Sequence, residues 1–265
     1  MTDFSRELEC AKKAAMEAGK AIAKFYGQSL KVTHKSASQP LTEADLASNQ
    51  IIKETLRSEF PEYGWLSEED IDNESRLNQH SLWVIDPLDG TRDFINKNPE
   101  FAVSIALVQD KKPVVGVVYN PVTREIFYAA KGAGAYCDGK SISVKKSVSS
   151  PPHLIVSQSE YGRGEWNPYE SDFKITPTGG CAYKMGKVAR GDADGTFTLS
   201  PKSEWDICAG VILVEEAGGV VSYLDGQKIT FNNPSTVMDG LIYCSSKTVH
   251  DVILDSIKRH ENTDL

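Results

Sequence analysis

The sequence lacks any apolar run that approaches the ~20 residues of a membrane span. Its opening segment, MTDFSRELECAKKAAMEAGK, also lacks the apolar core of a secretory signal peptide. The five cysteines are scattered, odd in number and form no CxxC pair, which argues against a disulfide framework and a zinc site. We therefore expect a soluble cytoplasmic protein with reduced thiols.

A basic excess is also missing, since 29 lysines and arginines stand against 37 aspartates and glutamates and give a formal net charge of −8. This balance argues against a nucleic-acid polymer or an anionic membrane as partner, because both attract basic surfaces. What the chain does contain is ordinary globular material, with 40% hydrophobic and 25% charged residues over 265 positions. An acidic protein can still bind a small phosphorylated ligand where metal ions supply positive charge locally.

The order of predicted elements indicates two lobes. Apolar residues at helical spacing predict a helix over residues 4–27, and Thr42 is a typical N-cap for a second helix. Residues 64–144 then contain strand-like segments separated by glycine, proline and asparagine. From about residue 150 shorter strands and helices alternate, and Pro151–Pro152 is the predicted boundary between a lobe of residues 1–150 and one of residues 151–265. This order favours an α+β fold in layers over a strictly alternating doubly wound sheet.

Carboxylates stand at the edges of apolar segments, where an uncompensated buried charge is costly. Oxygen ligands with no histidine or cysteine beside them suit a hard cation, Mg²⁺ or Mn²⁺, over zinc, and such a set could hold two or three ions. Each carboxylate alone also fits turn chemistry, a solvated acidic loop or a helix-end charge. Their combination favours a metal site, and the candidates are Asp45, Glu68, Glu69, Asp70, Asp86, Asp89 and Asp206.

The segment Asp89-Gly90-Thr91 offers groups for an anion. Gly90 permits a close approach of the backbone to a ligand, and a short helix is expected to begin at Thr91. Amides at a helix start favour a phosphate, and the Thr91 hydroxyl group can align a water. The residues therefore predict a site where metal ions and amides together neutralise a phosphate.

These motifs resemble those of the inositol monophosphatase superfamily of Mg²⁺-dependent, lithium-sensitive phosphatases. The resemblance covers most of the chain and is carried by LTEAD (41–45), LSEED (66–70), WVIDPLDGTRDF (83–94), GVVYNPVTREIFYAAKGAGAY (116–136) and WDICAGVILVEEAGG (205–219). It implies a layered αβαβα sandwich, two or three Mg²⁺ ions with Mn²⁺ as a substitute, inhibition by Li⁺, and a homodimer. It also implies that water hydrolyses a phosphoric monoester without a covalent enzyme intermediate.

The resemblance further implies roles for individual residues of this sequence. Thr91, hydrogen-bonded to Asp45, would position the attacking water together with Glu68. The implied metal ligands are Glu68, Asp86, the backbone carbonyl group of Leu88, Asp89 and Asp206. The implied substrate contacts are Asp89, Gly90, Thr91, Gly179, Gly180, Lys184 and Asp206.

Several details favour the 3′(2′),5′-bisphosphate nucleotidase branch of this superfamily. Ser67 in LSEED and the approach LSPKSEWD to the last aspartate resemble that branch. Lys184 falls where nucleotidases commonly carry lysine, and a cation there could meet a second phosphate. The segment IVSQSEYG departs from the branch, because Gln158 and Glu160 replace its usual arginine and histidine. TRDF, where many nucleotidases have Lys-Glu, leaves an inositol phosphatase open.

We therefore expect hydrolysis of 3′-phosphoadenosine 5′-phosphate to AMP and phosphate. The open alternatives are an inositol-1-monophosphatase, a broad-specificity sugar or NADP phosphatase of the same superfamily, and a non-catalytic or moonlighting binding protein on this fold. A non-catalytic protein would be expected to lack one of the metal ligands, and all are present. Lys184 also fits an exposed position on an amphipathic helix.

Overall fold

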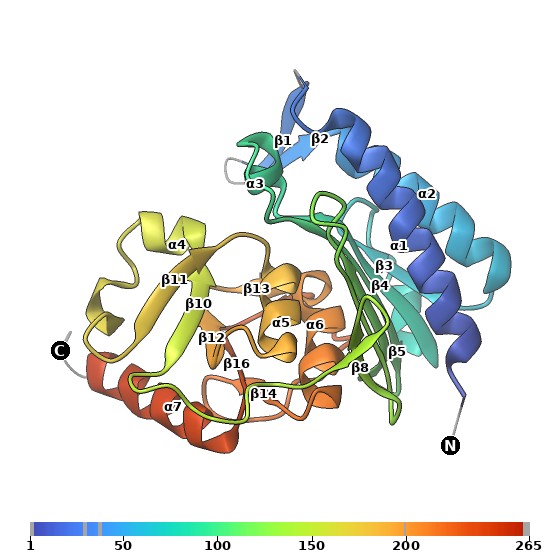
Figure 1. Cartoon of the computed structure of the whole chain (residues 1–265). Coiled ribbons are helices and arrows are strands. Elements are labelled where there is room, and N and C mark those ends of the chain that lie inside the picture. The colour runs from blue at the N-terminus through green and yellow to red at the C-terminus, as the bar shows by residue number, and fades with distance from the viewer. Residues whose placement is uncertain (1–2, 29–30, 37–38, 199, 262–265) are drawn as a thin grey trace.

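The computed structural model describes residues 3–28, 31–36, 39–198 and 200–261. Their helices and strands form five layers in the order helix, sheet, helix, sheet, helix (Figure 1). The layered αβαβα sandwich expected from the sequence is therefore confirmed. Within the described ranges, the helices are too short or too polar to cross a bilayer.

The outer helical layer packs on one face of the first sheet (Figure 1). Buried alanines along its first helix let the second helix and the sheet approach closely. The second helix begins as predicted at Thr42, which forms a capping box with Asp45. A short antiparallel hairpin precedes it, and the sequence pattern does not indicate this hairpin. The elements are α1 (Ser5–Phe25), β1 (Val32–Ser36), β2 (Gln39–Thr42) and α2 (Glu43–Glu59).

The first sheet keeps seven strands in chain order, antiparallel throughout except for the parallel pair of its first two strands. Its second strand is buried along its whole length. The ladder from this strand to the next is irregular between Asp86 and Asp89, where the strand ends. The elements are β3 (Gly64–Ser67), the 3₁₀ helix η1 (Glu74–Asn78), β4 (Ser81–Asp89), α3 (Thr91–Ile95), β5 (Ala102–Gln109), β6 (Lys112–Tyr119), β7 (Ile126–Ala130), β8 (Gly134–Cys137) and β9 (Lys140–Ile142).

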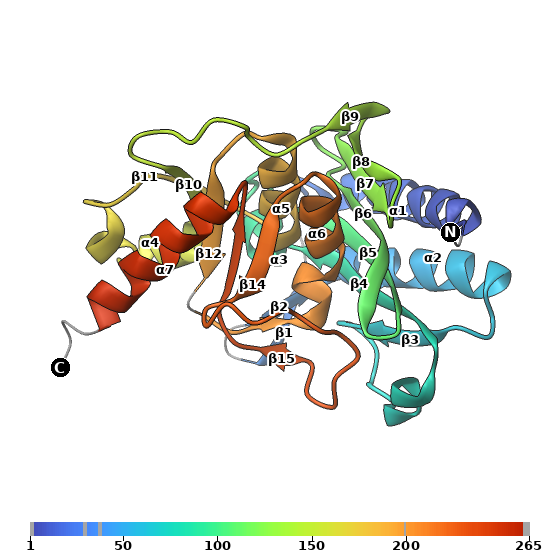
Figure 2. The same ribbon diagram turned by 90° about the horizontal axis from the view of Figure 1, so that it is seen from below.

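The second sheet has the order β11-β10-β12-β16-β14 and lies between the central helices and α7. Figure 2 shows the extended segment that leads to it from β9. Pro151–Pro152 lies in this segment, between the two sheets, and the division into lobes there stays a prediction. The elements are β10 (His153–Ser157), α4 (Gln158–Gly162), η2 (Asn167–Tyr169), β11 (Lys174–Thr178), α5 (Cys181–Arg190), β12 (Gly195–Thr198), β13 (Lys202–Ser203), α6 (Glu204–Glu216), β14 (Val220–Tyr223), β15 (Val237–Met238), β16 (Leu241–Cys244) and α7 (Lys247–Glu261).

Helix α6 is the central element, since it contacts strands of both sheets. Its residues from Ile207 to Val214 are all buried. Gly116 in β6 permits this packing, because an added Cβ would lie 2.5 Å from Ile212 Cγ2 and 2.6 Å from the Ala209 carbonyl oxygen. This close contact fixes the position of α6 on the sheet. It thereby places Asp206, at the start of α6, near the end of β4.

Candidate active site

The end of β4 forms one wall of the site. Asp86 and Asp89 are only 2% and 6% exposed. Asp86 Oδ1 accepts a 3.0 Å hydrogen bond from the Leu88 amide, which closes a tight turn. Gly90 follows with φ +90°, a conformation that favours glycine, and it directs the chain into α3 at Thr91. WVIDPLDGTRDF therefore brings two buried carboxylates and a helix start together.

Three carboxylates from three elements converge beside β4. Ligand oxygens of Glu68, Asp86 and Asp206 lie within 4.8 Å of one another. Burial and then repulsion from Glu68 raise the pKa of Asp206 to about 7. Burial, followed by repulsion from Glu68 and Asp89, raises the pKa of Asp86 well above its usual range. A divalent cation would relieve both penalties, and a donor set of carboxylate oxygens fits the predicted Mg²⁺.

Hydrogen bonds around Glu68 hold its turn in position. Asp70 accepts a 2.6 Å hydrogen bond from Trp65 Nε1 and forms a 3.0 Å ion pair with Lys53. Ser67, which precedes Glu68 at the end of β3, donates to Asn49 on α2 at 2.8 Å. The acidic segment SEED is therefore tied to α2 and β3 and differs from a freely solvated loop.

A second acidic residue holds the start of α6 beside Asp206. Glu204 is fully buried, and its carboxylate accepts hydrogen bonds of 2.8 Å from the backbone amides of Asn232 and Asn233. The Ser203 amide donates to Asp206 Oδ2 at 2.8 Å, as part of a capping box. One Asp206 oxygen is thus bound to the helix start, and the other can serve a ligand.

Thr91 and Asp45 are hydrogen-bonded, as the resemblance implied. Thr91 Oγ1 lies 3.0 Å from Asp45 Oδ1 and 3.1 Å from the Leu88 carbonyl oxygen. Asp45 is 1% exposed, and its other oxygen accepts from the amide and the hydroxyl group of Thr42. Burial raises the pKa of Asp45 in spite of these bonds. Because both partners of Thr91 are acceptors here, its hydroxyl hydrogen is directed to them and its lone pairs remain for another group.

Asp89 joins β4 to the first turn of α5. Its two oxygens accept hydrogen bonds of 2.8 Å from the amides of Cys181 and Ala182. Burial raises the pKa of Asp89 to about 6, although these amides and the charge of Lys184 oppose the rise. Gly180, at φ +58°, is needed for the close approach, since an added Cβ would lie 3.0 Å from Asp89 Oδ2.

A cavity of about 220 Å³ opens between these elements. Ten of its lining residues are predicted site residues: Glu68, Asp86, Leu88, Asp89, Gly90, Thr91, Gly179, Gly180, Lys184 and Asp206. Asp45 is not in the lining and reaches the site through Thr91. Cys181 also lines the cavity, although the sequence places no cysteine beside the carboxylates. Lys202 lines the cavity as well, and no local pattern in the sequence marks it.

Lys184 is buried, which decides between the two interpretations of this residue. Its side chain lines the cavity, and the residue is 7% exposed. The alternative of an exposed lysine on an amphipathic helix is therefore wrong. Within the described ranges its ammonium group makes no hydrogen bond or ion pair, although its charge lowers the pKa of Asp89, Asp93 and Glu160.

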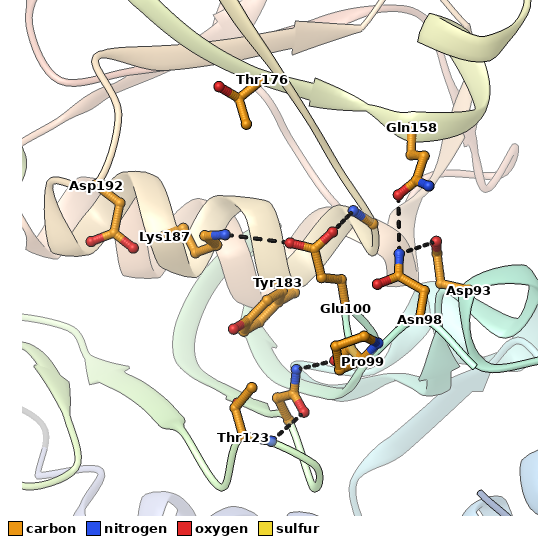
Figure 3. A network of polar contacts seen from close by, with 12 residues as sticks. Asp93, Asn98, Pro99, Glu100, Thr123, Gln158, Thr176, Tyr183, Lys187 and Asp192 are labelled. Carbon is orange, nitrogen blue, oxygen red and sulfur yellow. Dashed lines mark hydrogen bonds and ion pairs between the residues drawn. The ribbon is translucent and has the colours of Figure 1, made fainter. Parts of the chain in front are cut away.

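A polar network closes one rim of the cavity (Figure 3). Asn98 Nδ2 donates to Asp93 Oδ1 at 2.7 Å and to Gln158 Oε1 at 3.0 Å. Glu100 accepts a 2.8 Å hydrogen bond from the Gly179 amide, and its other oxygen lies 3.5 Å from Lys187. The network ties the segment after α3 to α4 and to the start of α5, so it holds the two sides of the cavity together.

Comparisons with known proteins agree with this geometry. A model of the inositol monophosphatase family matches residues 3–262. The chain is 32% identical to the inositol-1-monophosphatase of Mesorhizobium japonicum over 93% of this chain and 94% of that protein. It is 34% identical to the 3′(2′),5′-bisphosphate nucleotidase CysQ of Aggregatibacter actinomycetemcomitans over 84% of this chain and 89% of that protein. The solved structure of an IMPase from Thermotoga maritima has a TM-score of 0.85 and 27% identity and covers 96% of this chain and 97% of that one.

Proposed function

Because the chain belongs to the inositol monophosphatase family and is a phosphatase acting on phosphoric monoesters, we propose that its substrate is a 3′(2′),5′-bisphosphate nucleotide. The reaction is the hydrolysis of 3′-phosphoadenosine 5′-phosphate to AMP and phosphate. Relatives named for inositol phosphate and for bisphosphate nucleotides are similar to the chain to nearly the same degree. The cavity itself therefore has to favour one substrate over the other.

The observation that carries this proposal is the position of Lys184, whose residue is 7% exposed and lines the cavity. An ammonium group that faces a cavity of low solvent access favours an anionic ligand, because the ligand can form a charge-assisted hydrogen bond with it. The scissile phosphate has its own binding groups, namely the carboxylate cluster with its cation and the amides of Gly90 and Thr91. A second phosphate would pair with Lys184, whereas the hydroxyl groups of inositol 1-phosphate offer it no negative charge.

Glu68, Asp86 and Asp206 would hold Mg²⁺, with Asp89 and the Leu88 carbonyl group as the further ligands that the family resemblance implies. When bound, the cation supplies positive charge for the phosphate and for the leaving oxygen and lowers the pKa of a water. We place two or three ions here, with Mn²⁺ as a substitute.

The chain's own residues orient the attacking water. Thr91 has its hydroxyl hydrogen directed to Asp45 or to the Leu88 carbonyl oxygen, so it accepts a hydrogen bond from the water. Glu68 accepts the other hydrogen of the water and acts as the base. With both hydrogens held, the water's lone pair is directed at phosphorus. The water oxygen bonds to phosphorus as the P–O bond to the leaving group breaks. Glu68 holds the proton taken from the water, and the leaving oxygen takes up a proton from solvent water.

The second candidate is an inositol-1-monophosphatase, and one observation favours it. Gln158 and Glu160 stand where the nucleotidases usually have arginine and histidine, and Glu160 points away from the cavity lining. The cavity therefore lacks two groups that would contact a nucleotide in that branch. A broad sugar or NADP phosphatase would also fit a cavity with one buried lysine.

Phosphate release from a panel of monoesters with Mg²⁺ tests the proposal. The panel is 3′-phosphoadenosine 5′-phosphate, inositol 1-phosphate, fructose 1,6-bisphosphate, NADP and histidinol phosphate. We expect the highest kcat/KM for the nucleotide bisphosphate, and a higher value for inositol 1-phosphate would overturn the assignment. No release from any substrate with Mg²⁺ or Mn²⁺ would instead support a non-catalytic or moonlighting protein. Li⁺ should inhibit, and insensitivity to Li⁺ would argue against this subclass.

A variant pair tests the role of Lys184 directly. Lys184→Met should lower kcat/KM for 3′-phosphoadenosine 5′-phosphate by about ten- to a hundredfold, because a hydrogen bond between charged groups is lost. Lys184→Arg keeps the charge and should retain more of the activity. If inositol 1-phosphate is the substrate, Lys184→Met should leave the preference among the panel unchanged.

A further inference from the structure

A second lysine lines the cavity next to Lys184. Lys202 lies on β13, four residues before Asp206, and its side chain is 18% exposed. Its Nζ forms a 3.2 Å ion pair with Glu160 Oε1 on α4. Burial would lower the pKa of Lys202, but Cys181, Glu160 and Asp206 together raise it above its usual range. Lys202 in turn opposes the rise in the pKa of Asp206. Lys202 therefore stands between the carboxylate cluster and Glu160.

Glu160 is a buried residue whose carboxylate is bound by three donors. It is 3% exposed. Oε1 accepts from Thr198 Oγ1 at 2.8 Å as well as from Lys202, and Oε2 accepts from Trp166 Nε1 at 3.3 Å. Burial alone would raise the pKa of Glu160, but Lys202 and Thr198 hold it below its usual range. With its lone pairs engaged by three elements, Glu160 contacts Lys202 and leaves the ligand to other groups.

Behind the two lysines lies a smaller cavity of about 10 Å³ with a buried polar group in its wall. Lys184, Lys202, Cys181 and Tyr243 are among its lining residues. Tyr243 is 1% exposed, and within the described ranges its hydroxyl group has no hydrogen-bond partner. This end of the site thus gathers two ammonium groups and an unpaired phenol, a donor-rich wall suited to an oxyanion.

We propose that Lys202 is a specificity-determining residue that binds the second phosphate of the substrate together with Lys184, and that Glu160 positions Lys202 for this contact. The inference rests on the proposed function, and it names the group that selects a bisphosphate over a monophosphate. A phosphate dianion between two lysines gains charge-assisted hydrogen bonds to both. Glu160 keeps Lys202 from turning to the carboxylate cluster, where its charge would compete with the metal.

Two substrates that differ only in the second phosphate isolate this contact. 3′-Phosphoadenosine 5′-phosphate and 3′-AMP share the scissile 3′-phosphate, so the ratio of their kcat/KM values reports the 5′-phosphate alone. Changes in metal binding or in folding affect both substrates and cancel in the ratio. Fructose 1,6-bisphosphate with fructose 1-phosphate forms a second pair, which distinguishes a sugar bisphosphate from a nucleotide as the source of the phosphate.

We expect Lys202→Met to lower the nucleotide ratio by about ten- to a hundredfold, chiefly through KM. Lys202→Arg should retain more of the ratio, and Glu160→Gln should lower it by about three- to tenfold, since the charge of its partner is lost while its shape is kept. Lys12→Met on α1 is the matched control. It removes a lysine whose side chain is 20% exposed and whose ammonium group pairs with Glu9 at 2.7 Å outside the cavity lining, and the ratio should not change.

The outcomes separate the two proposals. A wild-type ratio near one for both pairs means that the second phosphate is not recognised, and the proposed function fails together with this inference. A large wild-type ratio that survives in Lys202→Met overturns the role of Lys202 alone. A ratio that falls in Lys202→Met but stays at the wild-type value in Glu160→Gln overturns the positioning role of Glu160. If Lys202→Met does not fold, as judged by its melting temperature, Lys202→Gln replaces it in the same assay.

Discussion

The carboxylate cluster should make Mg²⁺ binding strongly dependent on pH. Carboxylate ligands bind a metal in their deprotonated form, so protons and Mg²⁺ compete for them. In the metal-free protein the pKa of Asp206 is about 7, that of Asp89 is about 6, and that of Asp86 is well above its usual range. Below neutral pH, protons therefore occupy groups that the cation requires.

The size of the effect follows from the pKa of Asp206. At two pH units below a pKa of about 7, only about one carboxylate in a hundred is ionised, so this proton alone weakens Mg²⁺ binding about a hundredfold, or about 2.7 kcal/mol. Protons displaced from Asp86 or Asp89 add to this factor.

The stability of the metal-free protein changes in the opposite direction. Because the folded pKa values lie above the ordinary 3.8, the native state holds more protons, and the free energy of unfolding falls as pH rises from about 4 to about 7.

Titration calorimetry near pH 5, 6 and 8, in buffers of different ionisation enthalpy, gives both the Kd for Mg²⁺ and the number of protons released. We expect a loss of affinity of at least about a hundredfold at the lowest pH, with net proton release. Mg²⁺ should also raise the melting temperature more near pH 8 than near pH 5. Asp206→Asn should bind Mg²⁺ more weakly but with a shallower pH dependence. A Kd that varies by less than about threefold, with no proton release, would refute the reasoning.

Three further substitutions test other parts of the site and fold. Thr91→Ala should lower kcat by about a hundredfold or more while Thr91→Ser retains most activity, since the hydroxyl group directed by Asp45 orients the water; equal losses in phosphate-release assays would contradict this. Gly116→Ala should lower the free energy of unfolding by about 1–3 kcal/mol, because its Cβ would lie 2.5 Å from Ile212. An unchanged urea midpoint would speak against that contact. Asp89→Asn should abolish turnover, and near-wild-type phosphate release would disprove its role.

Local sequence signals predicted those parts of the fold that local physics determines. Thr42 caps the second helix as its pattern indicated, and the structure shows that it does so in a capping box with Asp45. The apolar run of β4 ends in Asp86 and Asp89. The turn that follows requires Gly90 with a positive φ, and this glycine is visible in the sequence. Glu68 and Asp206 stood out because the first follows an apolar strand and the second begins an apolar helix, and the family resemblance then selected Glu68 among the three acidic residues of SEED.

Contacts between distant parts of the chain could not be predicted in this way. The hairpin of β1 and β2 has no alternating apolar pattern, and β11 contains Pro177, which argues against a strand at the level of sequence. No local pattern in LSPKSEWD marks Lys202 as a site residue. Its ion pair with Glu160 spans 42 residues, so only the tertiary structure brings the two together.

The cavity keeps opposite charges apart, and the physical reason leads to a last prediction. Asp89 and Lys202 carry opposite charges and both face the cavity. They do not pair with each other, because the amides at the start of α5 bind Asp89 and Glu160 binds Lys202. Glu160→Gln should free the Lys202 ammonium group to approach Asp206 and so raise the Kd for Mg²⁺ by about three- to tenfold. Adding Lys202→Met to that variant should restore Mg²⁺ affinity, because the competing charge is then gone. Calorimetry on the single and double variants measures this coupling. If the double variant binds Mg²⁺ no better than Glu160→Gln alone, Glu160 does not act on the metal through Lys202.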